Sequence, residues 1–233
     1  MPNPFESLFA AILDDDRAKV KMLLAGDPAL TKRSVAEERY DSGIAHWIYA
    51  GDTVLHVAAA GHRVEIARML LAAGADFSAA KNRRCSQPLH YASDGYLDNP
   101  CWNARRQVAM IRLLLQAGAS LDAQDKNGAT PLHRAVRTRC AAAVECLLDA
   151  GADPTIKNKP GSTPFHLAVP NTGRGGSGSE QARTAQREIL QAFLERGVSP
   201  TLADAKGKSV LDWARTDWIQ KLLTGNAPYP RRN

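Results

Sequence analysis

The chain has 233 residues, of which 44% are hydrophobic, 23% charged and 6% aromatic. A chain of this length can bury a substantial core, and its balance of apolar and charged residues excludes a disordered protein. The formal net charge of +6 favours an acidic partner over a basic one.

The start of the sequence has no secretory pattern, and the cysteines have no metal-binding pattern. The start, Met1-Pro-Asn-Pro-Phe-Glu, has no basic stretch followed by an apolar run, so it is not a secretory signal. No segment reaches the ~18 consecutive apolar residues that a membrane helix needs. The four cysteines form no C-x-x-C pair, and their spacing matches no zinc site. We expect a cytoplasmic protein without a membrane segment; secretion without a cleaved signal remains an open alternative.

Two short helices are expected at the N-terminus, followed by a long connection. Apolar side chains recur on one helical face over residues 5–13, and an aspartate after them can cap a second helix that ends near Gly26. Residues 27–52 are too long for an ordinary repeat junction and contain an alternating aromatic stretch. A hairpin or a partly ordered loop is predicted there. In a strand, Trp47 and Tyr49 would share one face because they are two residues apart.

A short motif recurs along the rest of the chain. It reads T-V-L-H from Thr53, Q-P-L-H from Gln87, T-P-L-H from Thr130 and T-P-F-H from Thr163, with a truncated S-V-L-D from Ser209. Each opening except the last is followed by an apolar triplet at i, i+3 and i+4 and then by a glycine. This pattern predicts an amphipathic helix that ends at a left-handed residue. Since one helix pair cannot bury its apolar stripe alone, stacked pairs are expected to share a continuous core.

In this pattern the chain resembles the ankyrin repeat family over nearly its whole length. The resemblance implies an all-α fold, an ankyrin-repeat α-solenoid of stacked helix–turn–helix pairs with projecting β-hairpin loops, comprising four full repeats plus N- and C-terminal caps. We expect a single ankyrin repeat domain over residues 1–226 and a flexible tail at 226–233. Its expected parts are an N-terminal cap at 1–26, the long loop or hairpin at 27–52, repeats at 53–86, 87–129, 130–162 and 163–208, and a C-terminal cap at 209–225.

Two of the repeats carry inserts. The interval from the motif histidine to the glycine is about ten residues longer in the repeat from Gln87, and about thirteen longer in that from Thr163, than in the other two. The extra residues are expected between the two helices, at 94–107 and 170–187. The second insert is rich in glycine and serine, which favours a flexible loop. Loops on a rigid scaffold often carry function, but neutral loop growth explains these inserts equally well.

The histidines indicate structure rather than chemistry. Four of the six share the motif position, where the family resemblance implies hydrogen bonds within and between adjacent repeats: His56, His90, His133 and His166. The other two, His46 and His62, have no H-E-x-x-H or cysteine partner. We therefore expect no enzyme, no metal and no cofactor. Near the first insert, only Asp94, Asp98 and Cys101 are candidates for a catalytic site.

The predicted hairpin tips are rich in lysine and arginine. In the family these tips lie beside the concave groove, so the resemblance implies a row of positive charge that can bind an acidic segment of another protein. The alternative is that solvated turns simply favour lysine. By resemblance, the partner-binding positions on the tips are Arg83, Arg84, Ser86, Lys126, Asn127, Ala129, Lys159 and Ser162. Those at the exposed end of the first helix are Asp94, Arg137 and Thr138.

The favoured function is a non-enzymatic protein–protein interaction module, a scaffold that acts as a monomer. A second hypothesis is binding of nucleic acid or another polyanion along the same basic ridge, but the tips lack aromatic side chains for base stacking. A third is an enzyme or ligand site under the inserts at 94–107 and 170–187. The sequence does not identify the partner.

Overall fold

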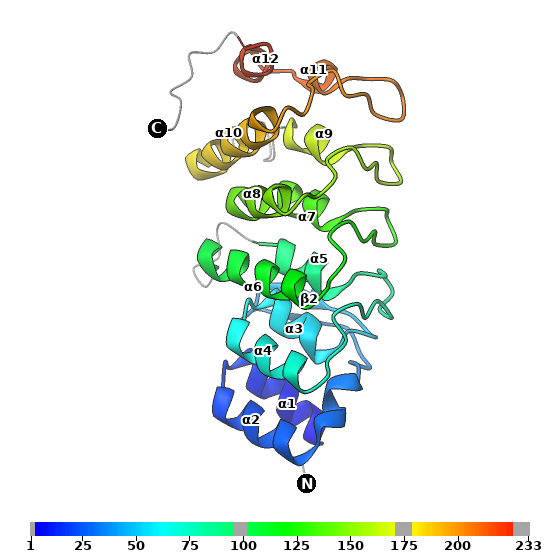
Figure 1. Ribbon diagram of the computed structural model, residues 1–233, viewed down its shortest axis with the longest axis vertical. Helices are drawn as coiled ribbons and strands as arrows, with labels where there is room; N and C mark the ends of the chain where they lie inside the picture. Colours follow the sequence, from blue (N-terminus) through cyan, green and yellow to red (C-terminus); the bar gives the residue numbers. More distant parts are fainter. Residues whose placement is uncertain (1–2, 96–101, 171–178, 226–233) are drawn as a thin grey trace.

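The computed structural model describes residues 3–95, 102–170 and 179–225. Within these ranges the helices follow one another in pairs that stack along one axis, with hairpin loops projecting to one side (Figure 1). In chain order the pairs are α1 (Pro4–Leu13) with α2 (Arg17–Gly26), α3 (Val54–Ala60) with α4 (Val64–Ala72), α5 (Pro88–Ser93) with α6 (Ala104–Gln116), α7 (Pro131–Arg137) with α8 (Ala141–Asp149), α9 (Pro164–Ala168) with α10 (Glu180–Glu195), and α11 (Val210–Trp213) with α12 (Asp217–Leu223). The fold is a helical repeat solenoid. In the described parts of the chain, none of these helices is long and apolar enough to cross a membrane.

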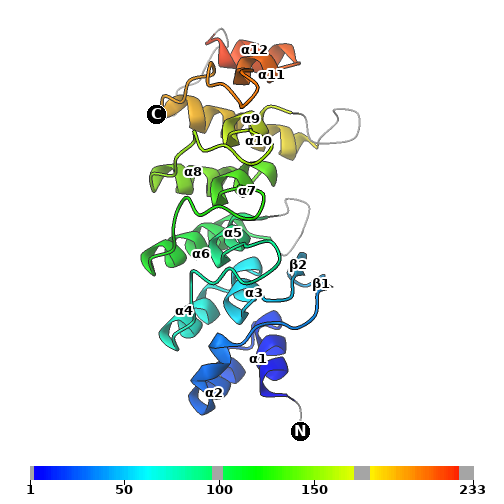
Figure 2. The ribbon, with the colours of Figure 1, turned by 90° about the vertical axis from the view of Figure 1, so that its right-hand side faces the viewer.

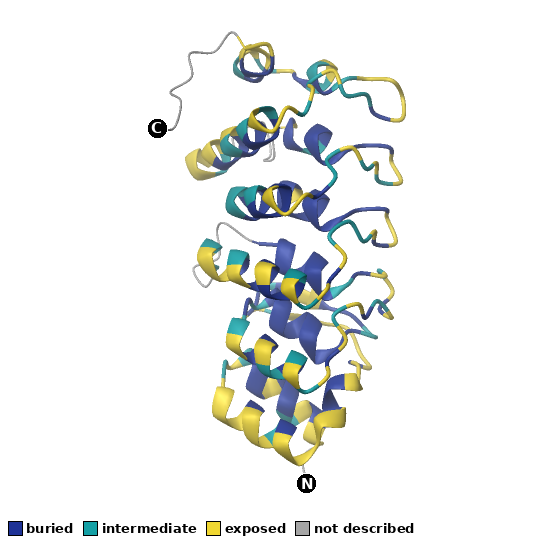
Figure 3. Cartoon of the chain, in the orientation of Figure 1, coloured by how far each residue is buried: buried dark blue, intermediate teal, exposed yellow. Residues whose placement is uncertain are grey.

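The core follows the predicted apolar triplets. The first two members of every triplet are fully buried: Ala67 and Leu70, Ile111 and Leu114, Val144 and Leu147, and Leu190 and Phe193. Figure 3 shows buried residues filling the first helices of the central pairs, whereas the second helices expose their outward sides. Each second helix therefore seals one side of a core that runs continuously through the stack.

The motif histidines join consecutive pairs. In three of them the ring Nδ1 accepts a hydrogen bond from the backbone N–H of the residue that begins the motif, at 3.0–3.2 Å. The ring Nε2 then donates to a carbonyl oxygen just before the next motif. The acceptors, at 3.0–3.1 Å, are Ser86 for His56, Ala129 for His90, Ser162 for His133 and Lys208 for His166. The predicted structural role of these four histidines is confirmed.

The insert-bearing pairs differ from expectation in one respect. The second helices α6 and α10 have 13 and 16 residues, against 9 each for α4 and α8. Residues 104–107 and 180–187, expected in loops, are therefore helical. Among them Gln107, Ala185 and Gln186 are buried and extend the inward faces of α6 and α10. The remaining inserted residues at 96–101 and 171–178 lie outside the described residues.

Two equivalent buried glutamines bind the backbone where each insert begins. The buried amides of Gln107 and Gln186, at equivalent places in α6 and α10, donate to the carbonyl oxygens of Ala92 and Ala168 at 3.2 and 2.9 Å. These carbonyls lie at the ends of α5 and α9. Neighbouring carbonyls in each chain segment, those of residues 94 and 169, accept from the same two amides. The ends of the shortened first helices thus find the partners that buried backbone groups require.

The connection from 27 to 52 forms the predicted hairpin. After a short helix, η1 (Pro28–Lys32), strand β1 (Arg39–Asp41) pairs antiparallel with β2 (His46–Ile48). Figure 2 shows both strands beside α3, on the side of the stack away from α4 and α6. The predicted shared face of Trp47 and Tyr49 is wrong. Tyr49 lies beyond the end of β2 and is buried, whereas Trp47 is 49% exposed and packs on Tyr40 across the hairpin.

Candidate partner-binding surface

The projecting hairpins share one turn geometry. An Asn or Asp side chain at the start of each turn accepts a hydrogen bond from the backbone N–H four residues later, at 2.9–3.0 Å: Asn82 to Ser86, Asp125 to Ala129, Asn158 to Ser162 and Asp204 to Lys208. Three turns reach a left-handed conformation at a glycine, at Gly128, Gly161 and Gly207. The first turn places Cys85 there instead, at φ 51°. We call this row of turns the hairpin comb: residues 82–86, 125–129, 158–162 and 204–208.

Backbone hydrogen bonds fix neighbouring hairpins to one another. The amide of Lys126 donates to Arg84 O at 2.7 Å, that of Lys159 to Asn127 O at 2.8 Å, and that of Ala205 to Gly161 O at 2.9 Å. The approach is close enough that a Cβ at Gly128 would lie 2.9 Å from Lys159 N. The side chains at the tips are therefore carried in a fixed register.

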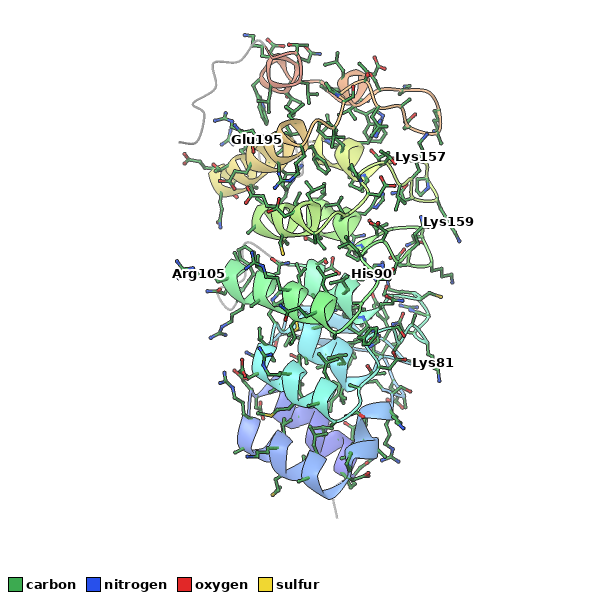
Figure 4. All side chains as sticks on the ribbon, viewed as in Figure 1. Lys81, His90, Arg105, Lys157, Lys159 and Glu195 are labelled. Atoms are coloured by element: carbon green, nitrogen blue, oxygen red, sulfur yellow. The ribbon has the colours of Figure 1, made fainter. Side chains whose placement is uncertain are left out.

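Two lysines of the comb are free of ion pairs. Lys126 and Lys159 occupy the same place in successive turns and are exposed, and no ion pair engages either within the part of the chain that the structure describes. Figure 4 shows Lys81, Lys157 and Lys159 along the hairpin side of the stack, opposite Arg105. Asn127 is also exposed. At the end of α7, Arg137 is exposed, with its guanidinium 3.5 Å from Asp94 Oδ1, and Thr138 is half-buried.

The two predicted arginines of the first tip are engaged within the molecule. Arg83 Nε lies 2.8 Å from Glu38 Oε1, and its guanidinium lies over the Tyr49 ring at 4.9 Å. Arg84 donates to the Tyr49 hydroxyl at 3.1 Å. The segment between α2 and α3 therefore occupies the N-terminal end of the predicted basic ridge.

Four predicted contact residues are buried, and their placement on a contact surface is corrected here. Ser86, Ala129 and Ser162 lie at the roots of the hairpins, where their carbonyl oxygens accept the motif histidines described above. Asp94, only 5% exposed, is bonded to Arg134 and His46. These residues belong to the framework because burial and hydrogen bonding already use their polar groups.

A buried arginine organises the polar interior beneath the comb. Arg134 donates to Asp94 Oδ2 at 2.6 Å, to Asp125 Oδ2 at 3.0 Å and to Ser86 Oγ at 2.7 Å. Burial by itself raises the pKa of Asp94, but the Arg134 guanidinium and the His46 ring outweigh it and hold that pKa well below its usual range. A charged Arg134 thus joins two hairpins and the end of α5.

Two hollows lie outside this network. The end hollow, about 540 Å³, lies at the C-terminal end of the comb, and its walls include Lys206, Lys208, Trp213 and Arg215. The outer hollow, about 460 Å³, lies between α4, α6 and α8, with Arg68, Arg105 and Arg112 at its rim. The sequence did not predict the end hollow, because its walls come from segments that no local pattern connects.

No group of three or more His, Cys, Asp or Glu side chains in the described ranges is placed to hold a metal ion. Burial raises the pKa of Cys140 to about 11, so its thiol is protonated at neutral pH. Of the predicted catalytic candidates, Asp94 is tied to Arg134, while Asp98 and Cys101 lie outside the described residues.

Family models agree with the repeated geometry. The model described as "Ankyrin repeat" matches residues 50–83 and 87–126, and that described as "Ankyrin repeats (many copies)" matches residues 114–168. Comparison with curated proteins gives no match. Ankyrin repeats are generally protein–protein interaction modules and are typically non-enzymatic. With the stacked helix pairs, the linking histidines and the hairpin comb, the chain belongs to the ankyrin repeat family.

Proposed function

We propose that the chain is a non-enzymatic module that holds an acidic segment of a partner protein against its hairpin comb. One observation carries the proposal: Lys126 and Lys159 are exposed at the same place of adjacent turns, and the 2.8 Å bond from Lys159 N to Asn127 O sets their register. Charges held on a rigid backbone attract a complementary partner without the entropy cost of ordering that backbone.

The proposed contact surface is narrower than the resemblance implied. It comprises Lys126, Asn127 and Lys159 on the tips, with Arg137 and Thr138 at the end of α7. Arg83 and Arg84 are secondary members, since a partner would have to compete with Glu38 and Tyr49 for them. Long-range attraction by the lysines would accelerate encounter, and contacts beside α7 would supply specificity.

We also propose that residues 1–226 form one domain with a cap at each end. The C-terminal end supports this. Asp212 replaces the motif histidine there and accepts from Ser209 N at 2.8 Å, which keeps the bond within the motif. A histidine would also need a following hairpin to receive its Nε2–H. The carboxylate therefore suits a pair that ends the stack.

The test compares two double charge reversals of equal size. Lys126→Glu with Lys159→Glu alters the comb. Arg105→Glu with Arg106→Glu alters two exposed positions of α6, of which Arg105 is seen on the other side of the stack (Figure 4). The proteins captured by each variant from the native cell are measured by quantitative mass spectrometry. We expect the comb variant to capture at least about tenfold less of the partner than the wild type. The α6 variant should retain it. Both should unfold at the wild-type temperature, because exposed charges contribute little stability.

Equal retention by both variants would contradict the proposal. Loss of the partner by the α6 variant alone would show that the partner binds at the outer hollow instead of the comb. If the captured material were nucleic acid, with an affinity that falls steeply as salt rises, the polyanion hypothesis would replace it.

A further inference from the structure

The end hollow continues the comb at its C-terminal end. Its walls come from the end of α9, the last hairpin, α11 and the connection between α11 and α12. The last hairpin is joined to the preceding one by the 2.9 Å bond from Ala205 N to Gly161 O, two residues from Lys159. Its volume of about 540 Å³ is in the range of pockets that enclose small ligands. It can therefore receive side chains from a segment that lies along the tips.

The two carboxylates in its wall are already engaged. Asp204 Oδ1 accepts from the backbone amides of Lys206 and Lys208 at 2.8 and 2.9 Å, and its Oδ2 accepts from Trp213 Nε1 at 3.2 Å. Asp212 Oδ2 accepts from both the amide and the hydroxyl of Ser209, at 2.8 and 2.7 Å. These hydrogen bonds hold the carboxylates in the turn and the cap.

The cations of the same wall make no such hydrogen bonds to described residues, although, after the hydrogen bonds from Ser209, the charge of Lys208 helps to lower the pKa of Asp212. Lys206, Lys208 and Arg215 are exposed, and within the described ranges no ion pair engages any of them. Beside them, the half-buried ring of Trp213 packs edge-on against His166, with centroids 5.4 Å apart. The hollow thus combines three available positive charges with a fixed aromatic wall.

We propose that the end hollow is an anchoring pocket for the acidic segment of the partner protein. It takes two nearby side chains: a carboxylate, bound by Lys206, Lys208 and Arg215, and an apolar side chain that packs on Trp213. Aromatic anchors in pockets dominate binding at many interfaces, and charge complementarity sets orientation. The inference rests on the proposed function and deepens it, since it assigns the partner a mixed acidic and apolar motif.

The anchoring pocket is tested, without altering it, by adding a peptide to the isotope-labelled full chain and following the NMR signals of the chain. The probe is a synthetic peptide that alternates Asp and Glu with Leu, and the control peptide carries Asn and Gln in place of the acids. The indole N–H signal of Trp213 is assigned by its loss in Trp213→Phe. We expect this signal and the amides of Lys206 and Lys208 to shift with the acidic peptide alone. Shifts confined to the tips at 126–127 and 159 would overturn the pocket and leave the proposed function standing; absence of any shift would overturn both.

A pair of neutral variants tests the charges. Lys206→Gln with Lys208→Gln is compared with Arg105→Gln and Arg106→Gln, which remove the same charge from α6. By fluorescence anisotropy we expect the first pair to weaken binding of the acidic peptide about tenfold. The second should have less than about a twofold effect, since screened distant charges contribute little. Equal weakening by both pairs would overturn the pocket.

The apolar half of the motif has its own control. An all-aspartate peptide of equal length should bind the wild-type chain about tenfold more weakly than the mixed peptide, because it leaves the wall of Trp213 uncovered. Equal affinity would overturn the assignment of an apolar side chain to this pocket. Binding of single-stranded oligothymidylate as tightly as the mixed peptide would overturn the choice of a protein ligand.

Discussion

The two ends of the hairpin comb carry similar numbers of basic residues but use them differently. At the N-terminal end, Arg83 and Arg84 are engaged by Glu38 and Tyr49 from the segment that precedes α3. In the two middle turns, no segment among the described residues engages Lys126 or Lys159 in an ion pair, and both side chains remain exposed. A basic residue at a given repeat position is therefore available to a partner only where no other part of the chain has reached it first.

The same contrast continues beneath the tips. The position after the motif histidine is Tyr91 in α5 and Arg134 in α7, both buried and polar, but Leu167 in α9, which is half-buried. The Tyr91 hydroxyl donates to Asp52 at 2.8 Å, so it too is bound within the framework. The N-terminal part of the inner side is thus covered by its own polar network, whereas among the described residues the equivalent position of α9 carries the half-buried, apolar Leu167.

The largest loss of stability should come from removing Arg134 from the buried polar network. Arg134→Leu leaves Asp94 and Asp125 buried without their cation, so we expect a loss of about 3–5 kcal/mol in the free energy of unfolding. Arg137→Leu is the matched control, because Arg137 lies 3.5 Å from Asp94 but is 52% exposed, and should cost less than about 1 kcal/mol. Urea denaturation measures both. Equal losses would mean that the buried ion pairs of Arg134 contribute no more stability than the exposed one of Arg137.

Acidification should cause the next largest loss of stability, because it favours protonation of histidines that are buried in their neutral form. Burial lowers the pKa values of His62 and His90 to about 4, with smaller opposing effects from backbone hydrogen bonds and nearby carboxylates. Between pH 6.5 and 4 the unfolded chain binds protons that the folded chain does not, so stability is complete above this window and falls as the pH is lowered through it. Each histidine should contribute a loss on the order of 3 kcal/mol by pH 4.

Hydrogen exchange at pH 7.5 and 5.0 would locate this loss. The amides of α5, whose residue His90 must stay neutral, should lose more protection than those of α11, where Asp212 replaces the histidine. Uniform loss over all pairs would show that the stack responds as one cooperative unit rather than locally.

The smallest change in stability should come from the backbone conformation of the hairpin comb. Cys85 holds a left-handed conformation, at φ 51°, where the later turns have glycine, and it is exposed. Cys85→Gly should therefore raise the free energy of unfolding by about 1 kcal/mol, since side chains other than glycine are strained there. Gly128→Ala should have the opposite sign because its Cβ would press on Lys159 N. A destabilising Cys85→Gly would show that the thiol has a packing role.

The sequence by itself determined the repeated part of this protein. The motif histidines and the triplets such as Ile111 and Leu114 recur at positions that only a stack of helix pairs can bury together. Local patterns suffice there because each pair repeats the same short-range geometry. They also sufficed for the hairpin between α2 and α3, though not for which of its side chains face inward.

Only the tertiary structure decided which polar groups remain available. Ser86 and Ala129 occupy tip sequences like those of Lys126 and Asn127, yet their carbonyls accept histidines some 30 to 39 residues away in the chain. Arg83 is engaged by Glu38, and the end hollow joins α9 to the connection after α11. The histidine bonds recur from repeat to repeat, whereas the pairing of Arg83 with Glu38 and the end hollow depend on where segments outside the repeated motif meet. Repeat periodicity therefore carries no information about the last two.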